Sequence, residues 1–330
     1  MNSEFFQEIR RRALAGVKNS QCQKCYLEEE HGLKSERLTG LADYPAELTS
    51  TETSISKIRH FEVFIGRTCN LKCHSCHPQL STKWEEDYRV AQWPWEKPEH
   101  LEIDYSGIMA NMRDLEQIKI IGGEPALSKK TIGILNSLPP EVRKNVTVEI
   151  STNGTHLFSA EVLETLATYK TVLFNISIDG YGKLNEIIRY PSDWTSLEKN
   201  VDHYLQWSLK NSQIVPILHC TVSALNVFSL RQLEDWWQSK LSELSAKKPK
   251  SRYALLTQPE RLYIGNLPPS LKEKALQNLP SITKLDHIRS LLTSEEQNDS
   301  DLFNQMLQYC SDLDRIRGTR LKDVVPEIYL

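Results

Sequence analysis

FEVFIGRTCNLKCHSCHP, residues 61–78, joins an apolar segment to a loop that holds three cysteines. Residues 61–65 are rich in apolar and β-branched side chains, which favours a strand buried on both faces. Cys69, Cys73 and Cys76 follow with the spacing CxxxCxxC. Because thiolates are strong ligands for iron–sulfur clusters, zinc and copper, this stretch predicts a metal site where the strand ends.

Strands of the same kind recur along the chain and alternate with helical patterns. Further strands are predicted at residues 117–121, 146–151, 172–178, 214–222 and 253–256. Helices are predicted between them at residues 108–115, 129–138, 160–169, 196–209 and 230–244. Because parallel strands are joined by right-handed helical crossovers, the alternation predicts an α/β fold with a parallel sheet.

Polar or glycine-rich loops follow four of these strands. The cysteine loop follows the first strand, and ligands of α/β sheets bind beyond the carboxyl ends of the strands. We therefore predict that the loops meet at one ligand site. The other three loops are Gly122-Gly123-Glu124-Pro125, Ser151-Thr152-Asn153-Gly154 and Ser177-Ile178-Asp179-Gly180.

The three clustered cysteines allow two kinds of metal site. A four-iron cluster has four irons, so three cysteines leave one iron open for chemistry, as in a catalytic metal site. The alternative is a structural zinc site that borrows a fourth ligand from His74, His77 or the Cys22/Cys25 pair. Zinc usually takes paired CxxC or His-x3–5-His spacings, so the pattern favours the cluster.

Residues 69–76, CNLKCHSC, together with Gly122-Gly123-Glu124-Pro125, resemble the radical SAM superfamily. That resemblance implies a partial (β/α)6 barrel with a [4Fe-4S] cluster on Cys69, Cys73 and Cys76. It also implies that the cluster cleaves S-adenosylmethionine reductively, giving a 5′-deoxyadenosyl radical that abstracts hydrogen from a substrate. An electron donor such as flavodoxin or ferredoxin is implied as a partner.

The resemblance also implies cofactor contacts at the strand ends. The 122–125 turn would offer backbone carbonyls and the Glu124 carboxylate to the methionine ammonium, and Arg189 would clamp the methionine carboxylate. Ser75 stands where the family usually has an aromatic residue, so only its backbone would reach the adenine. The implied cofactor-binding residues are Ser75, Gly122, Gly123, Glu124, Pro125, Ser151, Asn153, Ser177, Asp179 and Arg189.

The N-terminal CxxC, Cys22 and Cys25, resembles that of twitch-domain-containing radical SAM proteins. An auxiliary iron–sulfur cluster there would need further ligands, from Cys220, Cys310, a non-cysteine side chain or cysteines upstream of a truncated start. A zinc site or two unligated thiols are the alternatives. We predict an N-terminal twitch-like segment at residues 1–56, in which residues 40–56 form a linker. The barrel follows at 57–260 and a helical extension at 261–330.

The remaining predictions concern location and partners. The balance of 40 Lys and Arg against 43 Asp and Glu does not predict a nucleic-acid partner, so a peptide or a small molecule is the expected substrate. Neither a long apolar run nor a signal peptide is evident, which predicts a cytoplasmic protein with reduced thiols and no membrane association. The rival interpretation is a non-catalytic iron–sulfur or zinc binding module.

Overall fold

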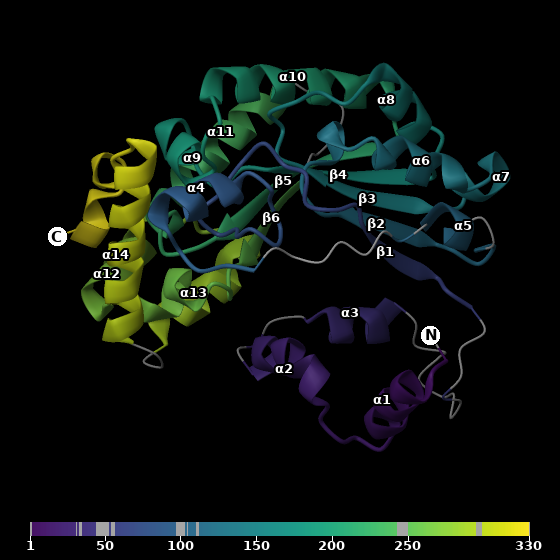
Figure 1. The fold of residues 1–330 in the computed structure, drawn as a ribbon, viewed down its shortest axis with the longest axis horizontal. Helices are drawn as coiled ribbons and strands as arrows, with labels where there is room; N and C mark the ends of the chain where they lie inside the picture. Colours follow the sequence, from purple (N-terminus) through teal and green to yellow (C-terminus); the bar gives the residue numbers. More distant parts are fainter. Residues whose placement is uncertain are drawn as a thin grey trace.

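The computed structural model shows a parallel sheet flanked by helices (Figure 1). It describes residues 2–30, 32, 35–43, 53, 57–96, 103, 105–109, 112–242, 250–294 and 299–329. Among the helices of these ranges, none combines the length and the apolarity that a bilayer crossing requires.

Six parallel strands form one sheet in sequence order, β1 to β6. All six predicted strands are confirmed, with shifts of one to three residues at some ends, so the α/β partial-barrel prediction is confirmed. The strands are β1 His60–Phe64, β2 Gln117–Ile121, β3 Thr147–Thr152, β4 Thr171–Ser177, β5 Ile214–Val222 and β6 Lys250–Leu255.

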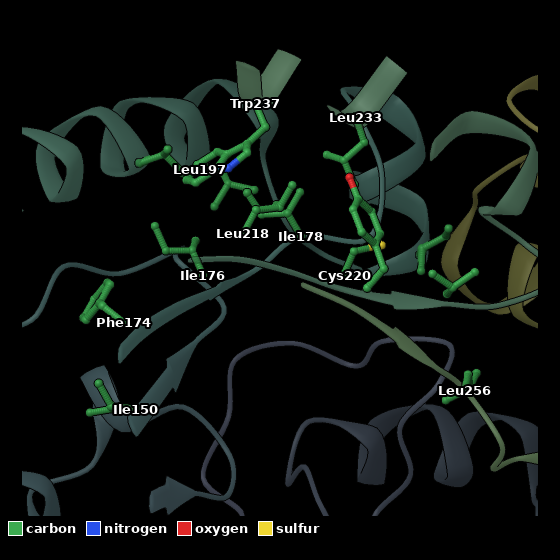
Figure 2. Packing of buried hydrophobic residues seen from close by; sticks show 14 of the residues in the cluster. Ile150, Phe174, Ile176, Ile178, Leu197, Leu218, Cys220, Leu233, Trp237 and Leu256 are labelled. Carbon is green, nitrogen blue, oxygen red and sulfur yellow. The ribbon is translucent and has the colours of Figure 1, made fainter. Parts of the chain in front are cut away.

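Helices between the strands cover one face of the sheet (Figure 1). Alternate residues of each strand point to this face, as Ile150 on β3 and Phe174 and Ile176 on β4 do, and all three are fully buried. Figure 2 shows this layer against Leu197 and Trp237. The helices are α6 Lys130–Ser137, α7 Pro140–Arg143, α8 Ala160–Leu166, α9 Lys183–Ile188, α10 Trp194–Lys210 and α11 Leu230–Ser242.

The opposite face of the sheet carries charge. Glu62 on β1 pairs with Lys119 on β2 at 3.0 Å, and Glu149 on β3 pairs with Arg252 on β6 at 2.7 Å. Strands β4 and β5 lie between β3 and β6, and neighbouring strands are about 4.8 Å apart. In a flat sheet Glu149 and Arg252 would be too far apart to pair, so the sheet is curved and this ion pair spans its hollow. This face is therefore the polar interior of the partial barrel.

The termini add helices outside the alternation (Figure 1). The N-terminal group contains α1 Glu4–Leu14, α2 Gln23–Glu30 and α3 Glu36–Asp43. Residues 40–43 of the predicted linker thus belong to a helix, while residues 44–52 and 54–56 lie outside the described residues. The C-terminal helices are α12 Pro269–Asn278, α13 Asp286–Thr293 and α14 Ser300–Arg317.

Two segments between β1 and β2 differ from prediction. Helix α4, Trp84–Ala91, was not predicted, because its buried residues are Trp84 and the charged Asp87, which make no apolar stripe. The helix predicted at residues 108–115 is confirmed at 108–109, where α5, Tyr105–Met109, ends, and is wrong at 112–115; residues 110 and 111 lie outside the described residues. Met112 and Leu115 are buried in the turn that follows, and their spacing therefore imitates a helical pattern.

Candidate functional site

The three predicted ligands lie on the loop that follows β1. Cys69, Cys73 and Cys76 are free and partly buried. The backbone N–H of Leu71 donates to Cys69 Sγ at 3.4 Å. The indole of Trp84, on α4, donates to the backbone carbonyl of Cys73 at 3.1 Å. The loop is thus held by its own backbone and by the following helix.

Burial raises the pKa of all three cysteines. Burial raises the pKa of Cys73 to about 11 and that of Cys76 to about 12, and it also raises the pKa of Cys69. The thiols are therefore protonated until a metal displaces the protons. Within the described ranges, no three Cys, His, Asp or Glu side chains converge as ligands of one ion. A four-iron cluster binds each thiolate at a different iron and does not require that convergence.

The Gly122–Gly123 turn packs directly on the backbone that leads into the cysteine loop. The N–H of Gly123 donates to the carbonyl of Gly66, and that of Glu124 donates to the carbonyl of Thr68, each at 2.7 Å. A Cβ atom on Gly123 would lie 2.1 Å from Thr68 O, and one on Gly122 would lie 2.5 Å from Gly66 O. Only glycine allows this approach of two backbones.

Glu124 joins this turn to the loop after β3. The side chain is fully buried, and its carboxylate accepts from Thr152 Oγ1 and from the N–H of Asn153 at 2.6 Å each, and from the N–H of Ala126 at 3.0 Å. Burial raises the pKa of this carboxyl, although the three hydrogen bonds oppose that shift. The carboxylate that we predicted as a ligand for the methionine ammonium thus has three donors within the protein.

Asn153 connects the same strand end to the cysteine loop. Its Nδ2 donates to Asn70 Oδ1 at 3.0 Å and lies 3.8 Å from Cys69 Sγ. The Nδ2 of Asn70 donates in turn to Thr155 Oγ1 at 2.8 Å. The structure therefore brings the predicted Asn153 beside a predicted cluster ligand.

The fourth strand end carries a buried ion pair. Asp179 Oδ2 accepts from Arg189 Nη1 at 2.7 Å, and Asp179 Oδ1 accepts from the N–H of Thr221 at 2.8 Å. Arg189 Nε is buried and has no hydrogen-bond partner in the described residues. The guanidinium also counteracts the burial that raises the pKa of Cys73. Asp179 and Arg189 thus lie together near the cysteine loop.

The other predicted residues have fewer contacts. Ser151 Oγ accepts from Asn175 Nδ2 at 3.3 Å, and Ser177 is partly exposed at the end of β4. Ser75 is partly exposed within the cysteine loop, and Pro125 is buried at the start of a short 3-10 helix, Pro125–Leu127.

The cysteines outside this loop divide into two kinds. Cys22 and Cys25 are free and partly exposed at the N-terminal helices. Cys220 and Cys310 are free and fully buried, and Cys220 belongs to the apolar layer under α11 (Figure 2). Burial raises the pKa of both buried thiols, which suits their role as small apolar side chains.

Sequence reasoning missed several polar residues of the barrel interior. Glu149 accepts from Asn175 Nδ2 at 3.0 Å and from Arg252 Nη1 at 2.7 Å. His219 on β5 faces the same hollow, in register with Ser177 on one side and Arg252 on the other. A charged residue inside an apolar strand, such as Glu149 in TVEIST, was the available signal.

A family model matches the part of the chain that contains the cysteine loop. Residues 63–220 match the family model described as Radical SAM superfamily. The chain is 28% identical over 123 residues to a probable GTP 3′,8-cyclase of Pyrococcus abyssi, covering 37% of this chain and 35% of that protein. A probable GTP 3′,8-cyclase of Pyrococcus horikoshii is 26% identical over 144 residues, covering 40% and 41% respectively. The matched region thus spans well under half of each relative.

Similar solved structures are more distant in sequence. Streptococcus suis SuiB bound to the precursor peptide SuiA has a TM-score of 0.45 at 13% identity, covering 94% of this chain and 57% of that chain. Native anSMEcpe with bound AdoMet has a TM-score of 0.45 at 19% identity, covering 67% and 59% respectively.

Proposed function

Because the chain is a member of the radical SAM superfamily through its domain at residues 63–220, we propose that it is an enzyme that cleaves S-adenosylmethionine reductively. When bound, the [4Fe-4S] cluster and S-adenosylmethionine supply a 5′-deoxyadenosyl radical that abstracts hydrogen from the substrate. The observation that carries this proposal is the cysteine loop after β1, which is tied to the strand ends of β2 and β3.

The cysteine loop supplies a donor set that suits a cluster. Cys69, Cys73 and Cys76 are the proposed ligands, and no fourth cysteine lies on the loop, so one iron stays open for S-adenosylmethionine. Cluster sulfur is stabilised by nearby N–H donors. Leu71 N and Asn153 Nδ2 beside Cys69 Sγ support this assignment.

The remaining strand ends would hold S-adenosylmethionine. Since the Glu124 carboxylate already accepts three hydrogen bonds, we propose that backbone carbonyls of the 122–125 turn accept from the methionine ammonium. The buried, unpartnered Nε of Arg189 supports its role at the methionine carboxylate, because an unsatisfied buried donor is costly. Ser151, Ser177 and the backbone of Ser75 are the proposed ribose and adenine contacts.

The substrate would enter the polar hollow of the barrel. We propose a peptide or a small molecule, and GTP is the first small molecule to test because the two archaeal relatives are named probable GTP 3′,8-cyclases. The electron donor would be a flavodoxin or a ferredoxin, and the proposed location is the cytoplasm, where thiols stay reduced. Cys22 and Cys25 remain the proposed location of an auxiliary cluster.

The test is the cleavage of S-adenosylmethionine itself. Anaerobically reconstituted protein, reduced with dithionite, is expected to form 5′-deoxyadenosine and methionine even without its substrate. The variant with alanine at positions 69, 73 and 76 is expected to form neither. Metal-loaded wild-type protein that forms no 5′-deoxyadenosine would instead favour the non-catalytic binding module.

A further inference from the structure

The C-terminal helix α14 ends in a buried arginine. The Arg317 side chain has no exposed surface, and Gly318, at φ +66°, ends the helix directly after it. A cation in the last helical turn is favoured by the helix dipole, but such residues are usually exposed to solvent. Full burial of a guanidinium is costly unless partners are fixed around it.

Those partners come from the helix and the loop that surround the proposed cluster. Arg317 Nε donates to Asp87 Oδ2, on α4, at 2.7 Å, and both side chains are buried. The other oxygen of Asp87 accepts from Lys72 Nζ, which belongs to the cysteine loop. The buried Asp87 carboxylate thus joins Arg317 of the C-terminal helix to Lys72, which lies between Cys69 and Cys73.

A second connection reaches the loop between Cys73 and Cys76. Tyr309, also on α14, donates its hydroxyl to the backbone carbonyl of His74 at 2.8 Å. Arg317 Nη1 lies 3.4 Å from His74 Nδ1. Two residues of α14 thus contact His74, which lies between Cys73 and Cys76.

The Arg317 guanidinium also stacks on the ring of Trp84, which belongs to α4, the helix that holds the loop. Its Cζ lies 4.7 Å from the centre of the Trp84 ring, and the Trp84 indole donates to the carbonyl of Cys73. The carbonyl of Cys73 is therefore held by Trp84, which contacts Arg317. The carbonyl of His74 is held by Tyr309, which lies on the same helix as Arg317.

We propose that Arg317 and Tyr309 are positioning residues that hold the ligand loop in the shape that binds the cluster. The inference rests on the proposed function, because it takes Cys69, Cys73 and Cys76 as the ligands. Arg317 has a second effect, since a buried cation close to the loop favours the more negatively charged, reduced cluster. The C-terminal extension is then part of the cofactor site.

The test compares Arg317→Gln, Arg317→Lys and Tyr309→Phe with wild type. The matched control is Arg315→Gln, on the same helix, where the side chain is 71% exposed and pairs with Asp312 at 3.3 Å. Iron and sulfide per chain are measured after anaerobic reconstitution and desalting, and the midpoint potential is measured by EPR titration. Far-UV circular dichroism checks that each variant is folded.

We expect Arg317→Gln to retain about half of the wild-type iron or less, with a more negative midpoint potential in the fraction that remains loaded. Arg317→Lys is expected to retain more iron than Arg317→Gln and to have a midpoint potential closer to that of wild type. Tyr309→Phe is expected to lose iron while staying folded. Unchanged iron and potential in folded Arg317→Gln and Tyr309→Phe would overturn the inference. Wild-type protein without iron and sulfide would instead overturn the proposed function on which it rests.

Discussion

Glu124 accepts a hydrogen bond of 2.6 Å from the backbone N–H of Asn153, so one buried carboxylate joins the loop after β2 to the loop after β3. The same Asn153 reaches the cysteine loop through its side chain. Three strand ends that are distant in the sequence are thereby fixed relative to one another. This connection brings the predicted site residues of three loops together at one edge of the sheet.

Replacing Glu124 with glutamine should destabilise the protein. The amide group would present donors where the carboxylate accepts, so Thr152 Oγ1 or the Asn153 N–H would lose its partner. We expect a loss of about 1–3 kcal/mol in the free energy of unfolding, measured by urea denaturation. Glu164→Gln, at an exposed position of α8, is the control and should change it little. Equal stabilities for the two variants would contradict the role of Glu124.

Replacing Gly123 with alanine should damage the cysteine loop. The new Cβ atom would lie 2.1 Å from Thr68 O, which is backbone and cannot turn away. We expect a loss of about 1–3 kcal/mol in the free energy of unfolding and less iron per chain after reconstitution. Gly133→Ala, in helix α6 with open space around it, should be neutral or stabilising. A Gly123→Ala variant as stable as Gly133→Ala would refute this packing.

Replacing Asn153 with aspartate should shift the midpoint potential of the proposed cluster. The change removes the Nδ2 donor 3.8 Å from Cys69 Sγ and adds a negative charge there. We expect a more negative potential by EPR titration and weaker retention of iron. Asn278→Asp, exposed at the end of α12, adds the same charge elsewhere and should leave the potential unchanged. Identical potentials in the two variants would argue against the contact.

The contribution of Glu149 to stability should depend on pH. Burial alone would raise the pKa of this carboxyl, but Arg252 and the Asn175 amide outweigh it and hold the pKa below its ordinary value. Because the folded-state pKa is the lower one, the contribution is present above the unfolded-state pKa and is lost as the pH falls through the folded-state value.

The measurement for Glu149 is urea unfolding of wild type and Glu149→Gln at several pH values. The stability difference should be largest near about pH 7 and should shrink as the pH falls below about 4. A difference that stays constant over this range would show that the charge of Glu149 plays no part.

The sequence predicted β1 to β5 to within one residue at each end because apolar and β-branched residues dominate them. The start of β6, KSRYAL, was missed by three residues because its first residues are polar. The polar loops could be predicted to meet because they follow the carboxyl ends of parallel strands. Helix α4 was missed because its buried residues are Trp84 and the charged Asp87, which make no apolar stripe. Helix α9 was missed because its six residues are too few to show a helical period. The buried partner of Arg317 could not be predicted either, because Asp87 lies 230 positions away and no local pattern records that distance.

The most direct test of the central claim is the content of iron, sulfide and zinc per chain after anaerobic reconstitution. Wild type is compared with the variant Cys69→Ala, Cys73→Ala, Cys76→Ala. We expect iron and sulfide in wild type and loss of that cluster in the variant, which would assign the cluster to these three cysteines; any iron and sulfide that remained would belong to Cys22 and Cys25. Zinc without sulfide in wild type would contradict it.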